Sequence, residues 1–500
     1  MDCLLGIDLG SSGVKAAVFG ADGTCLGTGA AKIERLKDQP LGRDLHDARD
    51  WWRQSVLAGR EALADISCDH DLRGIACCGF HHVPVFLDGS AEPAMPVVMM
   101  HDCELPASRE RLREDGRLQA LHEATRSFVS AAHFPSIAEE SRRSFAREWQ
   151  EVRHVLLAKD YLRYRLTGEL GTEICDATGT NLIRFGGDEW SVELAQSLKI
   201  KPEWLPAISQ SSDKAGELSS AAAGELGIEP GVPVYYGGGD SHCGLLGLGC
   251  IEAGSSAILL GTNCTLRTVF DRATYDPQTR LWAQRHVVGQ RWTVSASSLA
   301  GASVLQWARR LLSDGYDSAR AAGDRSSLAC EDGLFFLPFI HGERCPVYAP
   351  EASAAFVGLR SHHTAADMFE ASKEGIGFLL RMCWEIICEL AEGHGQALAA
   401  PVISGGGSAD LHWVGLIADT LGCELRHVEA GYAGCLGAAM LAGVGGGIFA
   451  DASDAVAKVG LAGRTIEPSA SANSQLSAGY ENFKKILELH IRSGCAPGGG

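Results

Sequence analysis

Three glycine-rich turns that follow predicted strands are the features of this sequence best suited to chemistry. They lie at residues 10–13, 261–263 and 405–408. Backbone N–H groups in such turns are not covered by side chains, so they can hold phosphate oxygens. Each turn taken alone could equally be an ordinary connection between two elements. Together they predict a phosphate site that is assembled from separate parts of the chain.

Two carboxylates accompany these glycines. Asp8 precedes the first turn, and Asp240 follows a fourth glycine run, Gly237-Gly238-Gly239. Asp240 could accept the proton of a hydroxyl group that attacks a phosphate, or it could cap a helix that begins near Ser241. The sequence contains neither G-x-x-x-x-G-K-[ST] nor G-x-G-x-x-G, so it predicts neither a P-loop nor a dinucleotide-binding fold.

Paired strands are needed to position the turns. Residues 4–19 predict two strands joined by the turn at 10–13, and a third strand is expected to begin near Cys25. Residues 256–270 repeat the pattern of strand, glycine- and hydroxyl-rich turn, and strand about half the chain later. Because similar elements recur at this separation, we predict two homologous domains.

Other segments predict the elements around the turns. Residues 72–87 contain two predicted strands separated by Gly79-Phe80-His81-His82, and helical periodicity dominates residues 104–165. A buried strand is expected at 232–236 and a helical stretch at 364–393. The overall class is therefore α/β.

The composition restricts the possible partners. Of the 500 residues, 46% are hydrophobic, and the formal net charge is −18. An acidic surface repels phosphate backbones and anionic lipids, so we expect neither nucleic acid nor membrane as a partner. No apolar run approaches the roughly 18–20 residues that span a bilayer. The 17 cysteines include no C-x-x-C pair, which favours buried thiols and a cytoplasmic location.

Several segments, in matching order and spacing over nearly the whole chain, resemble the FGGY carbohydrate kinases. They are GIDLGSSGVKAAVF at 6–19, KDYLRYRLTGELGTEICDATGT at 159–180, PGVPVYYGGGDSHCGLLGLG at 230–249, LLGTNCTLR at 259–267, FFLPFIHGERCPVYAP at 335–350, AAFVGLRSHHTAADMFEASKEGIGF at 354–378, SGGGSADLHWVGLIADTLGCEL at 404–425 and AGCLGAAMLAG at 433–443. The resemblance implies two related α/β domains of the actin-like, ribonuclease H-like ATPase fold with a central cleft.

The resemblance also implies where each part of the site lies. An N-terminal domain at 1–247 would carry the sugar site, the catalytic base and the first phosphate hairpin. A C-terminal domain at 248–490 would carry the second phosphate turn and the adenosine site. Residues 491–500 are expected to form a flexible tail.

For the phosphoryl donor, the resemblance implies ATP with Mg²⁺. Asp240 would be the catalytic base and Asp8 would help to hold hydrated magnesium. Lys15 could instead be a surface residue, and residues 405–407 could simply form a tight strand–helix turn. The residues expected to bind ATP are Ser11, Ser12, Lys15, Gly261, Thr262, Asn263, Gly405, Gly406 and Gly407.

The sugar site departs from the pattern of xylulokinase-like members. Where many of these carry G-Q-M-H-G, this chain has Gly79-Phe80-His81-His82-Val83, and their W-x-D-x-R is reduced to Met100-His101-Asp102-Cys103-Glu104. Neighbouring side chains of a strand point to opposite faces, so a metal shared by His81 and His82 is not expected. The residues expected to contact the sugar are His81, His82, Asp102, Asp240 and Ser241, the last standing where xylulokinases usually have asparagine.

These features predict an enzyme that phosphorylates a hydroxyl of a small sugar, with a ketopentose such as D-xylulose as the leading substrate. A sugar acid such as gluconate is the nearest alternative, because residues 261–267 also resemble the G-T-S-G-A-I-R of gluconokinases, and polyols remain possible. A sensing protein that keeps the clamp without turnover is the alternative outside enzymes. Related kinases often form dimers, so a homodimer is also possible.

Overall fold

The computed structural model describes residues 1–36, 40–64, 71–312 and 328–492, and these divide into two compact units. Unit 1 consists of Met1–Ile251, Asp271–Thr293 and Tyr432–Leu461. Unit 2 consists of Glu252–Phe270, Val294–Gly431 and Ala462–Gly500. The predicted domains at 1–247 and 248–490 were continuous, whereas two later segments of the chain return to unit 1. The predicted tail at 491–500 lies, from residue 493 on, outside the described residues.

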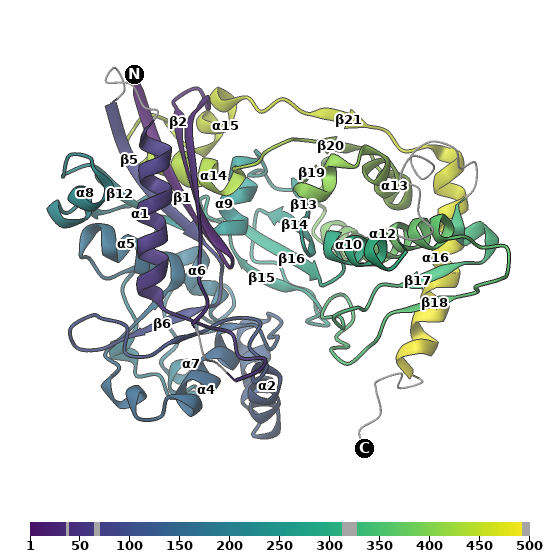
Figure 1. Ribbon diagram of the computed structural model, residues 1–500, viewed down its shortest axis with the longest axis horizontal. Coiled ribbons are helices and arrows are strands. Elements are labelled where there is room, and N and C mark those ends of the chain that lie inside the picture. The colour runs from purple at the N-terminus through teal and green to yellow at the C-terminus, as the bar shows by residue number, and fades with distance from the viewer. Residues whose placement is uncertain (37–39, 65–70, 313–327, 493–500) are drawn as a thin grey trace. The chain divides into compact units, whose positions relative to one another are not determined.

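The sheet of unit 1 places the first glycine-rich turn beside two parallel strands. Strands β1 (Asp2–Gly10), β2 (Gly13–Gly20) and β3 (Cys25–Lys32) form an antiparallel meander. Strands β5 (Asp71–Gly79) and β12 (Pro233–Gly239) continue the sheet parallel to β1, and β11 (Lys214–Glu217) closes it antiparallel. The strand order is β11-β12-β5-β1-β2-β3. Figure 1 shows β1 and β2 in purple beside α1. The hairpin predicted at 4–19 is confirmed.

Both faces of this sheet are covered, which explains why β1 is apolar along most of its length. Helix α1 (Ala48–Ala64) packs on β2 and β3, and helix α14 (Ala433–Gly445) packs on β1 and β5. Alternate residues of β1 enter different cores: Leu5 shares a core with Trp51 of α1, and Leu4 shares one with Cys435 of α14. The sheet is therefore a middle layer between helices.

Glycines allow α14 to lie unusually close to its neighbours. A Cβ added to Gly437 would lie 1.8 Å from the carbonyl oxygen of Cys243, which belongs to helix α9 (Asp240–Gly247). A Cβ added to Gly6 of β1 would lie 1.9 Å from the carbonyl oxygen of Cys435. Since backbone cannot yield as a flexible side chain does, these glycines fix the distance between α14, α9 and β1.

Unit 2 repeats the strand order of unit 1. The order β16-β14-β13-β19-β20-β21 corresponds, strand by strand, to β3-β2-β1-β5-β12-β11. Here β13 (Ser256–Leu260) and β14 (Cys264–Phe270) form the antiparallel hairpin, β19 (Val402–Ser404) and β20 (Leu425–His427) are parallel to β13, and β21 (Arg464–Ile466) is antiparallel. The predicted duplication is confirmed.

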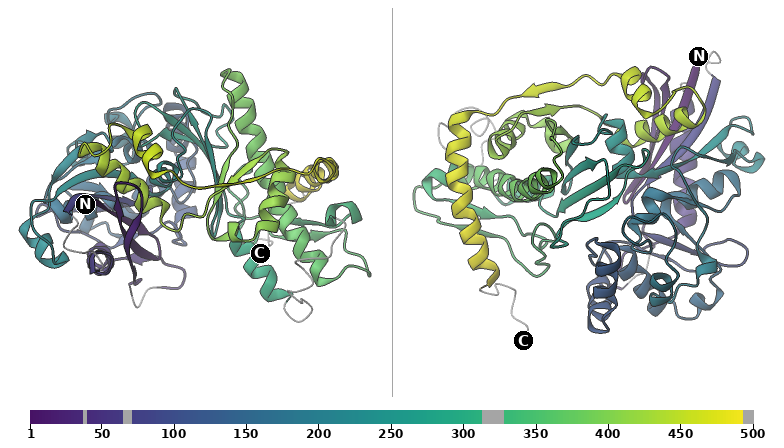
Figure 2. Two further views of the ribbon diagram at one scale, coloured as in Figure 1. Left: turned by 90° about the horizontal axis from the view of Figure 1, so that it is seen from above. Right: turned by 180° about the vertical axis from the view of Figure 1, so that it is seen from behind.

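Long helices support the sheet of unit 2. Helix α12 (Ala365–Gly393) packs on α13 (Leu411–Leu421), and α13 packs on α16 (Ala470–Arg492), the long yellow helix in Figure 2. Thr364 and Asp367 form a capping box at the start of α12, so the helix begins where the sequence at 364–393 predicted it.

The remaining elements complete the two units. Residues 72–87 contain β5 and β6 (Pro84–Leu87), as predicted. Residues 104–165 are not helical throughout, because they include strand β8 (His154–Leu157), which pairs with β6. The further strands and helices are β4 (Leu45–His46), β6 (Pro84–Leu87), β7 (Val97–Val98), α2 (Leu105–Glu114), α3 (Arg117–Thr125), α4 (Phe134–Ser144), β8 (His154–Leu157), α5 (Ala158–Thr167), β9 (Thr172–Glu173), α6 (Ile174–Gly179), α7 (Val192–Ser197), β10 (Ile208–Ser209), α8 (Ser220–Leu226), β15 (Trp282–Arg285), β16 (Trp292–Ser298), α10 (Ala302–Leu311), β17 (Phe335–Leu337), β18 (Ala355–Val357) and α15 (Ala452–Val459). Among the described residues, no helix has the length and apolar character needed to cross a membrane.

We expect Gly437→Ala to destabilise unit 1 by about 1–3 kcal/mol, because the added methyl group forces α14 away from α9. Gly224→Ala is the matched control. Gly224 lies in helix α8 with open space around its Cβ position, so alanine should leave stability unchanged or raise it by up to about 1 kcal/mol. Urea unfolding of the full chain measures both changes. Equal stability of the two variants would contradict the proposed glycine contact.

Candidate active site

The candidate site in unit 1 lies where three parallel strands end together. Strand register places Asp8 beside Cys78, Leu9 beside Gly79, and Gly79 beside Gly239. The loop after β5 and the first turn of α9 therefore lie beside the hairpin of β1 and β2. Carboxyl ends of parallel strands are the usual position of ligand sites in α/β sheets.

Asp240 begins helix α9, and Gly239 occupies the N-cap position. The Asp240 carboxylate accepts a 2.5 Å hydrogen bond from the backbone N–H of Ser241, and no side-chain capping bond is present at this helix end. Asp240 is thus not the N-cap that the alternative interpretation required. Its side chain is 38% exposed, so the carboxylate is open to a reactant.

Asp8 presents a buried carboxylate oxygen at the same sheet end. Its Oδ1 accepts no hydrogen bond from the described part of the chain. Burial raises the pKa of this carboxyl to about 7, with a further contribution from the negative charge of Asp240, while Cys78 and Lys15 oppose the shift. A buried carboxylate oxygen that feels the negative charge of a second carboxylate is well suited to a cation, and oxygen is the ligand atom that Mg²⁺ prefers. The residues present therefore fit the magnesium that the family resemblance implied.

The first predicted phosphate turn is accessible. Ser11 and Ser12 form the two-residue connection between Gly10 and Gly13, and both are exposed. Lys15 is exposed on β2, and its ammonium group lies 5.6 Å from the centre of the Tyr432 ring. The lysine is therefore at the surface near the turn, as both interpretations of its role allowed.

The other two predicted turns lie side by side in unit 2. Leu259 and Ser404 are register partners in the parallel strands β13 and β19, so the turns that follow lie at one sheet end. The N–H of Gly261 donates to the carbonyl of Asn263 at 3.0 Å, which closes a three-residue loop with Thr262 exposed at its tip. The sequence predicted that these two turns contribute to one phosphate site, and the structure places them side by side.

The fold itself requires glycine at two of the three positions 405–407. Gly405 has a φ of 101°, which favours glycine, and an added Cβ would lie 2.8 Å from the carbonyl oxygen of Leu260. A Cβ on Gly407 would lie 2.8 Å from the Trp413 ring. Gly406 has open space at its Cβ position. The tight-turn interpretation therefore accounts for Gly405 and Gly407, and nucleotide contact stays a prediction.

His81 is held in the site by partners on both ring nitrogens. Its Nδ1 lies 2.7 Å from Oδ1 of Asp176. Its Nε2 lies 3.0 Å from the Ser241 hydroxyl and 3.9 Å from Oδ1 of Asp240. The structure thus brings three predicted residues, His81, Asp240 and Ser241, into one group.

His82 has other partners than His81, but strand alternation, which the sequence analysis gave as the reason, is wrong. Both histidines lie beyond the end of β5, and His82 has a φ of 72°, so strand alternation does not apply to them. Nδ1 of His82 lies 2.8 Å from the carbonyl oxygen of Gly179, and its ring stacks on His133 at 4.2 Å. The partners of the two histidines are therefore different, as expected.

Asp102 is buried in a network of its own. Its Oδ2 accepts from Nε of Arg43 at 2.8 Å and from the N–H of Asp44 at 2.9 Å. Its Oδ1 accepts from the N–H of Glu104 at 3.0 Å. The structure gives this carboxylate a structural task at the start of α2, and its predicted contact with sugar stays a prediction.

Sequence reasoning missed the buried charges that hold His81. Lys159 of α5 is fully buried, and its ammonium nitrogen lies 2.6 Å from Asp160, 3.6 Å from Glu173 and 3.2 Å from Asp176. Burial alone would lower the pKa of Lys159, but these carboxylates raise it. Burial would raise the pKa of Asp176, whereas Lys159 and His81 lower it. No local signal marked these residues as buried, because charged residues are spread along the whole segment 159–176.

Known proteins resemble this chain in sequence and in fold. Residues 3–247 match the N-terminal domain of the FGGY family of carbohydrate kinases, and residues 253–446 match its C-terminal domain. A xylulose kinase of Klebsiella pneumoniae is 30% identical, over 88% of this chain and 89% of its own. A gluconokinase of Bacillus subtilis is 24% identical over 97% and 96%. A ligand-bound xylulose kinase from Lactobacillus acidophilus has the same fold, with a TM-score of 0.90 at 20% identity over 98% of both chains.

Removing the buried ammonium group of Lys159 should destabilise the folded protein. We expect Lys159→Met to reduce the free energy of unfolding by about 3–5 kcal/mol, because three buried carboxylates lose their common counter-charge. The matched control is Lys214→Met, which removes an exposed lysine paired with Glu217 at 2.8 Å and should leave stability nearly unchanged. Guanidinium unfolding followed by tryptophan fluorescence compares the variants. A Lys159 variant as stable as the control would refute this account of the cluster.

Proposed function

We infer the substrate and the catalytic residues from one premise: the chain belongs to the FGGY family of carbohydrate kinases and is therefore a sugar kinase that uses ATP and Mg²⁺. The two family domains account for most of the chain in the family's order. Transfer of the γ-phosphoryl group requires an acceptor hydroxyl in line with the phosphorus atom, a group that takes the hydroxyl proton, and neutralisation of phosphate charge.

We propose that the acceptor is a ketopentose, with D-xylulose as the leading substrate. The observation that carries this proposal is the 30% identity to a xylulose kinase over 88% of the chain. Gluconate is the second candidate, because a gluconokinase matches 97% of the chain at lower identity. The non-catalytic sensor is disfavoured, since a sensor has no need for an open carboxylate like that of Asp240.

Asp240 is the proposed general base. Its carboxylate is partly exposed and lies at the start of α9, and a carboxylate oxygen can accept the proton of an attacking hydroxyl. As the sugar oxygen attacks the γ-phosphorus, its O–H proton passes to an Asp240 oxygen, the bond between phosphorus and the ADP oxygen breaks, and ADP leaves. Ser241 stays oriented because its hydroxyl bonds with His81.

Asp8 is the residue proposed to help to hold Mg²⁺. Its buried Oδ1 accepts no hydrogen bond from the described chain and is thus available to a hydrated cation. When bound, magnesium neutralises charge on the phosphate oxygens. Asp8 and Asp240 then have separate tasks, although they lie at the same end of the sheet.

The remaining proposed contacts follow the exposed turns. Thr262, at the tip of its loop, and Ser12, at the tip of the first hairpin, carry hydroxyls that can donate to phosphate oxygens. Gly406 lies where an approaching nucleotide would meet no side chain. For the sugar, His82 and His81 offer ring nitrogens and Ser241 offers its hydroxyl; Asp102 is retained as a weaker proposal because its oxygens already have partners.

Two further proposals concern the protein as a whole. A cytoplasmic location is proposed, in keeping with the described cysteines, none of which forms a disulfide. A homodimer is also proposed on the resemblance alone. Size-exclusion chromatography with light scattering would decide the second point.

We expect Asp240→Asn to lower kcat for the best sugar by at least about 100-fold, since general-base catalysis contributes about 10²–10⁴-fold. ADP release with Mg-ATP is measured across ketoses, polyols and sugar acids, and D-xylulose should give the highest kcat/KM. Asp188→Asn, at an exposed position, is the control and should keep the wild-type rate. A sugar-dependent rate that survives Asp240→Asn would exclude this base, and a higher kcat/KM for gluconate would exclude the proposed substrate.

We expect Asp8→Asn to raise the Mg²⁺ concentration required for half-maximal rate by about 10- to 100-fold, as loss of a group that orients hydrated metal does elsewhere. Affinity for D-xylulose without nucleotide, measured by calorimetry, should remain at the wild-type value. An unchanged magnesium requirement would show that Asp8 does not help to hold the ion.

A further inference from the structure

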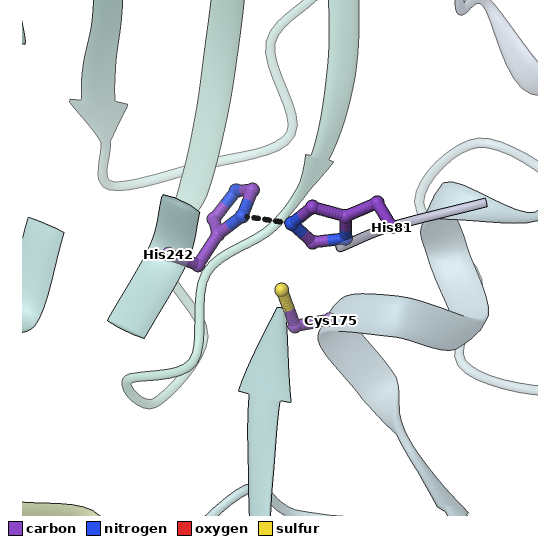
Figure 3. Close-up of side chains that lie close together, drawn as sticks. All are labelled: His81, Cys175 and His242. Atoms are coloured by element: carbon purple, nitrogen blue, oxygen red, sulfur yellow. Dashed lines mark hydrogen bonds between the residues drawn. The ribbon is translucent and has the colours of Figure 1, made fainter. Parts of the chain in front are cut away.

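His81, Cys175 and His242 form a buried group beside Asp240 (Figure 3). They come from the loop after β5, from helix α6 and from helix α9, and their exposed fractions are 7%, 0% and 0%. One nitrogen or sulfur atom of each residue lies within 4.8 Å of the others. Nδ1 of His242 faces Nε2 of His81 at 3.1 Å, which is the dashed line in Figure 3.

The outer nitrogen of each histidine has a polar partner. Nδ1 of His81 lies 2.7 Å from the Asp176 carboxylate, so that nitrogen carries a proton. Nε2 of His242 lies 2.8 Å from the Thr293 hydroxyl, which also lies 3.3 Å from the carbonyl of Gln284. Nε2 of His242 carries a proton when the hydroxyl donates to Gln284, and it accepts one when the hydroxyl donates to His242.

The first of these two arrangements of His242 leaves lone pairs facing each other at the centre of the group. Nε2 of His81 and Nδ1 of His242, when both rings are neutral, then lie 3.1 Å apart without a hydrogen between them. Two lone pairs repel at that distance unless a proton or a metal cation lies between the rings. The Ser241 hydroxyl and the Gln284 amide, which approach Nε2 of His81 and Nδ1 of His242 at 3.0 and 3.5 Å, can donate to these nitrogens but supply no positive charge.

Buried carboxylates lie behind the group. The carboxylates of Asp160, Glu173 and Asp176 share the single ammonium group of Lys159. Asp176 connects this cluster to His81, since its Oδ1 lies 2.7 Å from Nδ1 of that ring. A carboxylate behind a histidine is also the usual outer partner of a metal-bound imidazole, where it fixes the tautomer and the ring orientation.

Cys175 supplies the third ligand atom. Its sulfur accepts from the Gln284 amide at 3.9 Å, on the side of the group that faces His242. Metal binding replaces the S–H bond of Cys175 with a metal–sulfur bond and releases the thiol proton to the solvent.

We propose that His81, Cys175 and His242 bind Zn²⁺, with a water molecule or the Ser241 hydroxyl as fourth ligand. Two imidazoles and one thiolate form a set that zinc accepts and that Mg²⁺, which prefers oxygen ligands, does not. The site is therefore chemically distinct from the magnesium site of the kinase reaction. It also differs from a metal shared by His81 and His82, since His82 has other partners.

Zinc at this position inhibits the kinase. It occupies Nε2 of His81, which otherwise contacts Ser241 and lies 3.9 Å from the proposed base. This consequence depends on the proposed function, whereas zinc binding itself does not. The first measurement is therefore made without sugar or ATP.

The test uses Co²⁺ as a spectroscopic substitute for zinc on the chelator-stripped full chain. We expect one equivalent of Co²⁺ to give a thiolate-to-cobalt absorption band that one equivalent of Zn²⁺ removes. Cys175→Ser should abolish the band, and His242→Ala should weaken metal affinity by at least about tenfold. Circular dichroism and thermal unfolding verify that these variants fold.

Matched controls exclude other ligands. Asp332, His362 and His363 form a second possible metal group, and Cys25 and Cys103 are exposed thiols. His362→Ala/His363→Ala and Cys25→Ser/Cys103→Ser should retain the band. A missing band in the wild type, or a band that survives Cys175→Ser, overturns the proposal.

X-ray absorption of the zinc-loaded wild type gives a measurement without variants. One sulfur and at least two nitrogen neighbours at the metal are expected, whereas a shell of oxygen and nitrogen alone would refute the site. Turnover of D-xylulose by a protein that binds no zinc would leave the proposed function intact and reject only this inference. Zinc binding without loss of kinase activity would reject only the proposed inhibition.

Discussion

The buried ammonium group of Lys159 is the interaction on which the geometry of the candidate site depends. It joins α5 to carboxylates of α5, β9 and α6, and through Asp176 it fixes the ring of His81. His81 then orients Ser241 beside Asp240. A hydrophobic replacement of this cluster could be equally stable in principle. It could not, however, direct a hydrogen-bonding ring toward the start of α9, so the charge cluster is better explained by positioning than by stability.

A second constraint is the close approach of helix α14 to the backbones of α9 and β1. Gly437 brings α14 against Cys243 of α9, and Gly6 brings α14 against β1. Asp8 and Asp240 are therefore attached to elements that cannot slide independently. The same strand order appears in unit 2, where β13 and β19 set two glycine-rich turns side by side. One arrangement of strands thus positions Asp8 and Asp240 in one unit and two glycine-rich turns in the other.

Much of this was predictable from sequence because local signals were strong. The hairpin turns at 10–13 and 261–263, the helical stretch at 364–393 and the position of Asp240 after a strand all followed from spacing and residue type. The buried charge cluster was not predictable, because Lys159 and Asp176 meet only through the tertiary fold. His81 and His82 were wrongly assigned strand geometry, since the positive φ of His82 has no signal in a histidine. The return of residues 432–461 to unit 1 likewise depends on packing of α14.

The departures from the xylulokinase pattern are best understood as one coupled change. His81 stands where many relatives have methionine, and Ser241 stands where they have asparagine. In the structure these two residues share a 3.0 Å hydrogen bond, and His242 contacts the same nitrogen of His81. A methionine at position 81 could neither bond with Ser241 nor pair with Asp176, so each substitution makes chemical sense only with the others. The polar group so formed touches the candidate base itself, and any difference in sugar preference from the relatives should therefore originate there rather than at the separate network of Asp102.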